Sequence, residues 1–202
     1  MTGRAEGEPR NQGRLDRIAA WAARRPAVAI VAAWSFAEAI VFPIVPDVLL
    51  DVIGLAAPRR AGRLFLISVL ASVAGTALLF ALASYLPALA QGVVLAVPGV
   101  DRSMLDSAGV AVGGGDPFSL ALFGPGTPLK VFTVAWALGP GTAGPLLLGA
   151  VLNRCTRILP TLVGAAAAGA IAPRWLRRHE RPALGLYTIA WISVYSLYFG
   201  AT

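Results

Sequence analysis

The sequence is short of the residue types from which most enzyme sites are built. Only 13% of its 202 residues are charged, and it contains one cysteine, one histidine and one lysine. A single cysteine, Cys155, cannot form an internal disulfide. The only histidine, His179, rules out a histidine-rich zinc site and lies in an arginine-rich connection typical of a solvated surface. With no Ser/His pair or aspartate-rich phosphotransfer motif, the sequence disfavours an enzyme and predicts neither a cofactor nor a metal.

Apolar residues, in contrast, are abundant. They make up 57% of the chain, and the mean hydropathy is +0.71, whereas soluble domains carry about 25% charged residues. The polar residues gather at the ends and in a few short loops. This pattern is typical of an integral membrane protein. The polar stretch 1–17 has no apolar run leading to a cleavage site, so we do not expect a secretory signal.

The net charge of +7 is unevenly distributed. Arginines gather at 4–25, 59–63 and 174–181, while the connection 100–116 carries three aspartates and one arginine. Basic clusters on alternate connections follow the positive-inside rule and predict a cytoplasmic N-terminus. Contact with anionic lipid headgroups explains them better than nucleic-acid binding does.

The apolar runs predict an all-α integral membrane protein with three spanning helices, two opposed re-entrant helical hairpins and an N-terminal interfacial amphipathic helix. Residues 1–25 form a polar N-terminus and the interfacial helix at 13–25. A membrane domain follows at 26–172, and 173–202 form a basic inner loop and a C-terminal span at 183–199. Within the membrane domain we expect a re-entrant segment at 26–57, a span at 64–86, an outer loop at 98–118, a second re-entrant segment at 119–140 and a span at 144–172.

The re-entrant interpretation rests on two interrupted segments. "FPIVP" interrupts the segment 26–57 and leaves a second piece, 48–57, of about ten residues. Such a piece is roughly 15 Å of helix, which is about half of the bilayer core. Both ends of 26–57 carry arginines, which favours a hairpin that returns to its own side. "FGPGTPLK" repeats the order of Phe, Pro and charge from the opposite face. The structural breaks are Pro43, Pro46 and Pro128. Paired interruptions of this kind point to a polar site near the midplane.

Two acidic residues flank the first break and are candidate binding residues. An ionised group at this depth costs at least a few kcal/mol, so Glu38 and Asp47 are functional candidates. The alternatives stay open: Glu38 as a buried ion pair that holds the hairpin shut, and Asp47 as a helix N-cap. Asp51 lies one turn later, where an interfacial charge is the alternative.

Three basic residues complete the candidate site for a substrate or ion. If Thr127 caps the next helix and Pro128 opens it, Lys130 lies in the first turn, where N–H donors and a cation favour an anion. Arg154 and Arg157 are three residues apart on one helix face, and arginine binds phosphate with two hydrogen bonds. The alternatives are a salt bridge from Lys130 to Glu38 or Asp47, and permanent neutralisation of the carboxylates by the arginines.

Three stretches carry a resemblance to a known family: "FAEAIVFPIVPDVLL" (36–50), "TPLKVFTVA" (127–135) and "LLGAVLNRCTRILP" (147–160). They resemble the DedA family, also called the SNARE-associated Golgi or VTT-domain family, and especially its small bacterial YqaA-type branch. The resemblance implies two facing re-entrant helices in a small multi-pass bundle of the bacterial inner membrane. It also implies lipid transport, since members are implicated in moving polyprenyl-phosphate or phospholipid. Larger members carry arginine on both sides of the second-loop proline, whereas here only Lys130 follows Pro128.

These observations favour a carrier, flippase or scramblase for a phosphate-bearing anionic lipid, with proton coupling through Glu38 or Asp47. The expected partners are membrane lipids with anionic or polyprenyl-phosphate headgroups, and no nucleic acid. Two alternatives remain: an ion- or proton-coupled transporter or channel for a small soluble anion, and a non-catalytic membrane-integrity protein. The sequence leaves open the lipid, the coupling ion and the oligomeric state.

Overall fold

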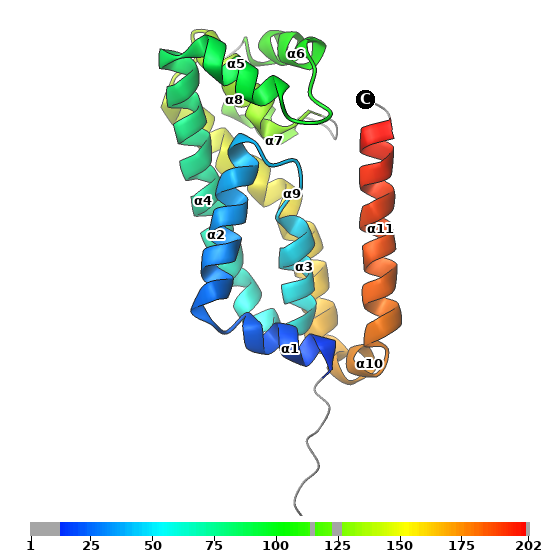
Figure 1. The fold of residues 1–202 in the computed structure, drawn as a ribbon. Coiled ribbons are helices and arrows are strands. Elements are labelled where there is room, and N and C mark those ends of the chain that lie inside the picture. Colours follow the sequence, from blue (N-terminus) through cyan, green and yellow to red (C-terminus); the bar gives the residue numbers. More distant parts are fainter. Residues whose placement is uncertain (1–12, 114–115, 123–126, 201–202) are drawn as a thin grey trace, which may run out of the picture.

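The described part of the chain is helical throughout. In a computed structural model of the protein, residues 13–113, 116–122 and 127–200 are described, and every regular element within them is a helix (Figure 1). The all-α prediction is therefore confirmed for these residues. The polar segment 1–12 and residues 123–126 of the second predicted break lie outside them.

Two long helices run along the molecule, α4 (Pro58–Tyr85) and α9 (Ala143–Ile171). They correspond to the spans predicted at 64–86 and 144–172. Among the described residues they are the two helices long and apolar enough to cross a membrane. The third predicted span lies in one helix, α11 (Glu180–Gly200), which is not among those two.

The first predicted break is present as the bend of a helical hairpin. Helices α2 (Arg25–Ile40) and α3 (Asp47–Ala56) run in opposite directions, and α2 packs mainly on α4 while α3 packs mainly on α9. Pro43 and Pro46 lack the N–H that a helix needs, and each disfavours helical geometry in the residue before it. The open end of the hairpin lies beside α1 (Arg14–Trp21), and its bend lies part-way along the long helices (Figure 1).

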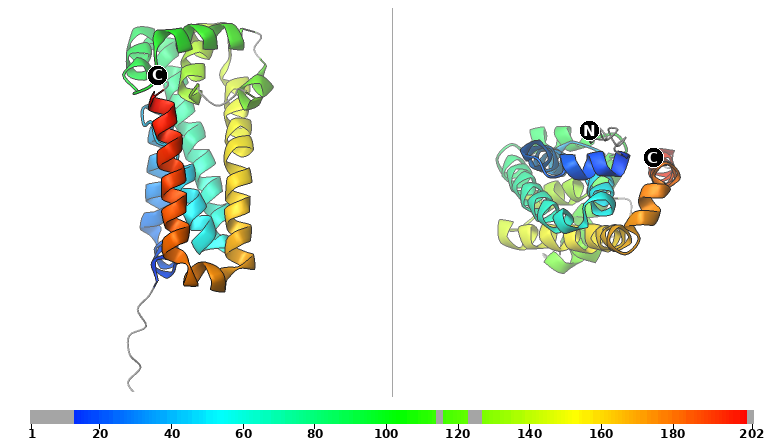
Figure 2. Two further views of the ribbon diagram at one scale, coloured as in Figure 1. Left: turned by 90° about the vertical axis from the view of Figure 1, so that its right-hand side faces the viewer. Right: turned by 90° about the horizontal axis from the view of Figure 1, so that it is seen from below.

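The other end of the molecule is formed by four shorter helices. They are α5 (Pro87–Leu95), α6 (Arg102–Val112), α7 (Pro117–Leu122) and α8 (Leu129–Leu138) (Figures 1 and 2). The second predicted re-entrant segment, 119–140, therefore contains α8 and most of α7. Of these helices, α7 packs on α9, and α8 packs on both α4 and α6.

The connection predicted as an outer loop at 98–118 contains a helix, α6. Asp101 caps it by accepting a 2.8 Å hydrogen bond from the N–H of Met104. This bond and one from the Ser103 hydroxyl lower the pKa of Asp101. Leu105, Ala108 and Val112 recur at helical spacing and are buried, so the apolar face of α6 packs on α8 despite the acidic character of the segment.

Helix α11 lies at the periphery of the bundle, joined to it through the short helix α10 (Pro173–Arg178) (Figure 2). Its first residue, Glu180, accepts a 3.2 Å hydrogen bond from the N–H of Leu15 at the start of α1. Further along, the hydroxyl of Tyr187 donates to the carbonyl of Val48 at 3.0 Å. The hydroxyl of Tyr195 accepts from the N–H of Val45 at 2.8 Å. These tyrosines attach α11 to the α2–α3 hairpin.

Glycines allow close contact between the hairpin and the long helices. A Cβ atom at Gly75 of α4 would lie 2.7 Å from the carbonyl oxygen of Phe36 on α2. A Cβ atom at Gly169 of α9 would overlap the carbonyl oxygen of Leu55 on α3. Both obstacles are backbone atoms, so neither can be relieved by rotating a side chain.

We expect Gly169→Ala to destabilise the protein and Gly164→Ala, on the same helix, to stabilise it. A Cβ at position 164 meets nothing within 4 Å, so that substitution gains about 0.5–1 kcal/mol of helix propensity. Overpacking at position 169 costs about 1–3 kcal/mol, and each kcal/mol shifts the Tm by about 2–4 °C in a chain of this length. Thermal unfolding of the two purified variants measures the difference. Equal Tm values would contradict the close α3–α9 contact.

Candidate functional site

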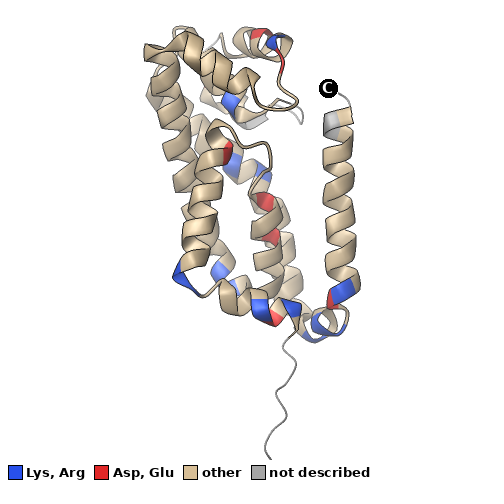
Figure 3. Ribbon diagram, viewed as in Figure 1, with Lys and Arg blue, Asp and Glu red and all other residues tan. Residues whose placement is uncertain are grey.

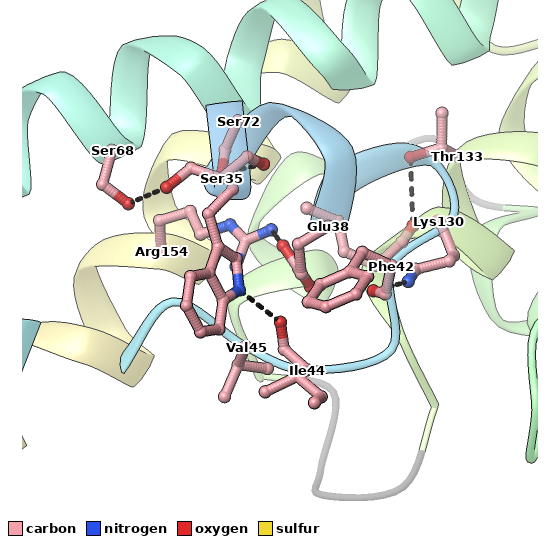
Figure 4. A network of polar contacts seen from close by, with 12 residues as sticks. Ser35, Glu38, Phe42, Ile44, Val45, Ser68, Ser72, Lys130, Thr133 and Arg154 are labelled. Carbon is pink, nitrogen blue, oxygen red and sulfur yellow. Dashed lines mark hydrogen bonds and ion pairs between the residues drawn. The ribbon is translucent and has the colours of Figure 1, made fainter. Parts of the chain in front are cut away.

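A cluster of buried charged side chains lies where the α2–α3 bend, the start of α8 and the first half of α9 meet (Figures 3 and 4). It lies apart from the basic residues near α1 and α10 (Figure 3). The buried charged residues of this region are Glu38, Asp47, Asp51, Lys130 and Arg154. Four of them are residues that the sequence predicts as a binding site, and Asp51 is the further acidic candidate.

The central contact is an ion pair between α2 and α9. A guanidinium nitrogen, Nη2 of Arg154, donates to Oε2 of Glu38, and the two side chains are 1% and 6% exposed. The Nε and Nη1 atoms of Arg154 are buried without a hydrogen-bond partner among the described residues. Buried donors left unpaired cost free energy. Arg154 can therefore donate further hydrogen bonds to an oxygen ligand.

Lys130 joins the two interrupted segments. Its Nζ atom donates a 2.8 Å hydrogen bond to the carbonyl of Phe42 in the α2–α3 bend (Figure 4). The alternative of a salt bridge to Glu38 or Asp47 is not observed, because the ammonium group bonds to a backbone carbonyl instead. Lys130 is in the first turn of α8, as predicted.

The predicted start of α8 is wrong by one residue. The helix begins at Leu129, and Pro128 is its N-cap in an extended conformation (φ −64°, ψ 145°), with no side-chain cap. Thr127 therefore does not cap the helix, and Pro128 is not its first residue. A proline ring is compatible with this extended geometry because it only fixes φ near −65°.

Asp47 and Asp51 lie one turn apart on α3, and both are buried. The capping alternative for Asp47 is not realised, because Pro46 is the N-cap of α3 and no side-chain cap bond forms. Each aspartate has one carboxylate oxygen without a hydrogen-bond partner among the described residues. The hydroxyl of Tyr187 donates to the other oxygen of Asp51 at 3.4 Å.

Arg157 differs from Arg154 although both lie on α9. Three residues along a helix correspond to a rotation of about 300°, so the two side chains point in directions about 60° apart. Arg154 is buried and Arg157 is exposed. Arg157 nevertheless interacts electrostatically with Asp47 and with Lys130, as do Glu38 and Arg154. The structure therefore brings all five predicted residues into one electrostatic cluster.

Several polar contacts around the cluster were not predicted. The hydroxyls of Ser35 and Ser68 lie 2.7 Å apart, and the hydroxyl of Ser72 donates to the carbonyl of Ser35 at 3.2 Å. The indole N–H of Trp34 donates to the carbonyl of Ile44 at 2.8 Å and so fixes the bend (Figure 4). Two serines four residues apart in an apolar helix are a detectable sign of helix–helix packing.

Two further contacts secure the surroundings of the cluster. The side-chain amide of Asn153 donates to the carbonyl of Leu120 at 2.8 Å and ties α7 to α9. Tyr187 and Tyr195 tie α11 to the hairpin, and the sequence signal is aromatic residues at a spacing of four, with Trp191 between them.

No group of three or more potential metal ligands occurs among the described residues.

Comparisons with known proteins add no family assignment. No protein-family model, no curated protein and no solved structure matches the chain.

We expect the Glu38–Arg154 pair to appear as strong coupling in a double-mutant cycle. Removing either partner strands a buried charge and costs about 3–5 kcal/mol. Glu38→Gln and Arg154→Met should each lower the free energy of unfolding, and the double variant should lose less than the sum of the two. Chemical unfolding of the four proteins measures this. Arg102→Gln on the exposed start of α6 is the control, with a change within about 0.5 kcal/mol. Additive losses would contradict the pair.

Proposed function

We propose that the chain is an integral membrane protein of the bacterial inner membrane with a cytoplasmic N-terminus. Helices α4 and α9 have 28 and 29 residues, or more than 40 Å of helix, against a hydrocarbon core of about 30 Å. Leu66, Leu70 and Leu78 on α4 and Leu186, Ile189 and Ile192 on α11 are exposed apolar side chains. Arginines concentrate at the end that carries α1 and α10 (Figure 3), in agreement with the positive-inside rule.

In this proposal α4, α9 and α11 span the membrane. The α2–α3 hairpin enters from the cytoplasmic side, and α7–α8 enter from the outer side. The support is the position of the α2–α3 bend part-way along α4 (Figure 1) and the bond from Lys130 to Phe42, which joins the two segments. The DedA resemblance of the same stretches is part of this proposal.

We propose further that the protein moves a phosphate-bearing anionic lipid across the membrane and is not an enzyme. The observation that carries this function is Arg154, which is buried with two donor atoms unpaired among the described residues, in the same cluster as the second buried cation, Lys130. Phosphate oxygens form short, charge-assisted bonds with such donors. The headgroup would bind where the two interrupted segments meet, while the acyl chains stay in the surrounding lipid.

The internal partners of the cations suggest how binding and release alternate. A phosphate that binds Arg154 and Lys130 competes with Glu38 for the guanidinium and with the Phe42 carbonyl for the ammonium. When the headgroup leaves, these internal partners return. Proton coupling would use Glu38 or Asp47, the two carboxylates of the predicted site. A protonated carboxyl is neutral and attracts the cations less, so protonation would favour the phosphate-bound state.

Lipid flux in liposomes tests the function. We expect purified protein to move a fluorescent phosphatidylglycerol between leaflets faster than it moves a fluorescent phosphatidylcholine. Glu38→Gln, Lys130→Gln and Arg154→Gln should each slow this flux by roughly tenfold or more, because each removes a charged contact. Arg102→Gln is the matched control. Fluxes equal to wild type in all three variants would overturn the proposal, and flux of inorganic phosphate without lipid movement would favour a soluble-anion transporter.

Single-cysteine labelling tests the topology. In a Cys155→Ala background, Arg59→Cys should react with an impermeant maleimide only from the cytoplasmic side. Pro140→Cys should react only from the outer side. Both positions are exposed, so burial does not limit their reaction. Labelling of both from one side would contradict opposed re-entrant hairpins.

A further inference from the structure

A second basic site lies at the α1 end of the molecule, separate from the central cluster. A hollow of about 480 Å³ is formed by the turn between α1 and α2 and by the first turns of α4. It is lined by Ala22, Ala23, Arg24, Arg25, Val28, Arg59, Arg60, Arg63 and Leu64. Five of these nine residues are arginines and none is acidic. The hollow is separate from the central cluster, because Arg25 and Glu38 lie 13 residues apart on α2, or about 20 Å along the helix.

The five arginines have no protein counter-charge within the described residues. The ion pairs there are Arg154–Glu38 and Arg177–Asp16, and neither involves the hollow. Like charges gathered in a small space repel one another. An anion bound among them removes that repulsion, so the hollow favours a negatively charged ligand.

The backbone around the hollow is held by packing. Ala22 and Leu64 are buried and belong to one hydrophobic cluster with Val31, Leu50 and Ile158. The segments that carry the arginines are therefore fixed relative to each other. The hollow also falls in the range of about 300–1,000 Å³ that is usual for small-molecule sites.

The face of α4 that leads away from the hollow is apolar. Arg59, Arg63, Leu66 and Leu70 follow at spacings of four, three and four residues, so they lie on one side of the helix. Leu66 and Leu70 are exposed. A ligand with its charge among the arginines can therefore extend apolar chains along this face.

We propose that this hollow binds the phosphate headgroup of an anionic lipid, whose acyl chains lie along α4. Arginine grips phosphate through paired N–H donors, and basic hollows between helices at the cytoplasmic side of a membrane suit such headgroups. Because five cations converge, a headgroup with two phosphates, as in diphosphatidylglycerol, binds more tightly than one with a single phosphodiester. The site does not depend on the proposed transport, since a lipid that stays bound satisfies it equally.

Native mass spectrometry of the full chain in a neutral detergent tests the site. The probes are diphosphatidylglycerol, phosphatidylcholine and inorganic phosphate. We expect wild type to prefer diphosphatidylglycerol to phosphatidylcholine by roughly tenfold or more, since a single additional charge-assisted hydrogen bond to phosphate is enough to change the affinity by that factor. Arg59→Gln/Arg63→Gln should remove most of that preference. Arg174→Gln/Arg178→Gln on α10 loses the same charge at the same end, outside the hollow, and should retain it.

A charge-conserving variant separates loss of binding from loss of fold. Arg59→Lys/Arg63→Lys keeps the charge and should bind diphosphatidylglycerol with an affinity between those of wild type and the glutamine variant. Equal losses in the α4 and α10 glutamine variants would overturn the site in favour of diffuse attraction. Retention of inorganic phosphate as tight as that of the lipid would overturn the lipid assignment and identify a soluble anion as the ligand. If wild-type protein binds diphosphatidylglycerol but moves no lipid in liposomes, that result would count against the transport proposal alone.

Discussion

The ion pair between Glu38 and Arg154 is the contact on which the arrangement of the interrupted segments depends. Both side chains are almost fully buried, so separating α2 from α9 would leave two charges without compensation in an apolar interior. The pair therefore sets the level along α9 at which the α2–α3 bend lies. At that level Lys130 reaches the Phe42 carbonyl, while Gly75 allows α2 to approach α4 closely enough to stay there.

The features of the fold that can be predicted from the sequence are those with a local signal. The apolar runs and the prolines at 43 and 46 predicted the long helices and the first break, because a missing N–H and a clash act on the nearest residues. The helix within 98–118 also has a local signal, which is a capping aspartate followed by apolar residues at 105, 108 and 112. These residues are buried in the structure. The prediction of an outer loop at 98–118 rests on acidic composition, which does not exclude an amphipathic helix within it.

The pairing of the buried charges could not be read in the same way. The distance from α8 to the α2–α3 bend decides which acceptor Lys130 bonds to. That distance is a tertiary property, and neither segment has a sequence pattern that indicates it. Likewise, Arg154 and Arg157 share a face in sequence terms, yet a rotation of about 60° leaves one buried and the other exposed. The contacts from α11 depend on where a peripheral helix comes to rest, which its spacing of aromatic residues does not determine.

The two basic sites differ in how strongly their own protein competes with a ligand. In the central cluster three cations face two predicted carboxylates, and both buried cations already hold internal acceptors. A phosphate there exchanges one partner for another, which lowers its net affinity and speeds its release. Within the described residues no ion pair involves the arginine hollow, so binding there relieves repulsion without that exchange. In the proposed cycle the first property suits a site that must let its ligand go, and the second suits one that retains it.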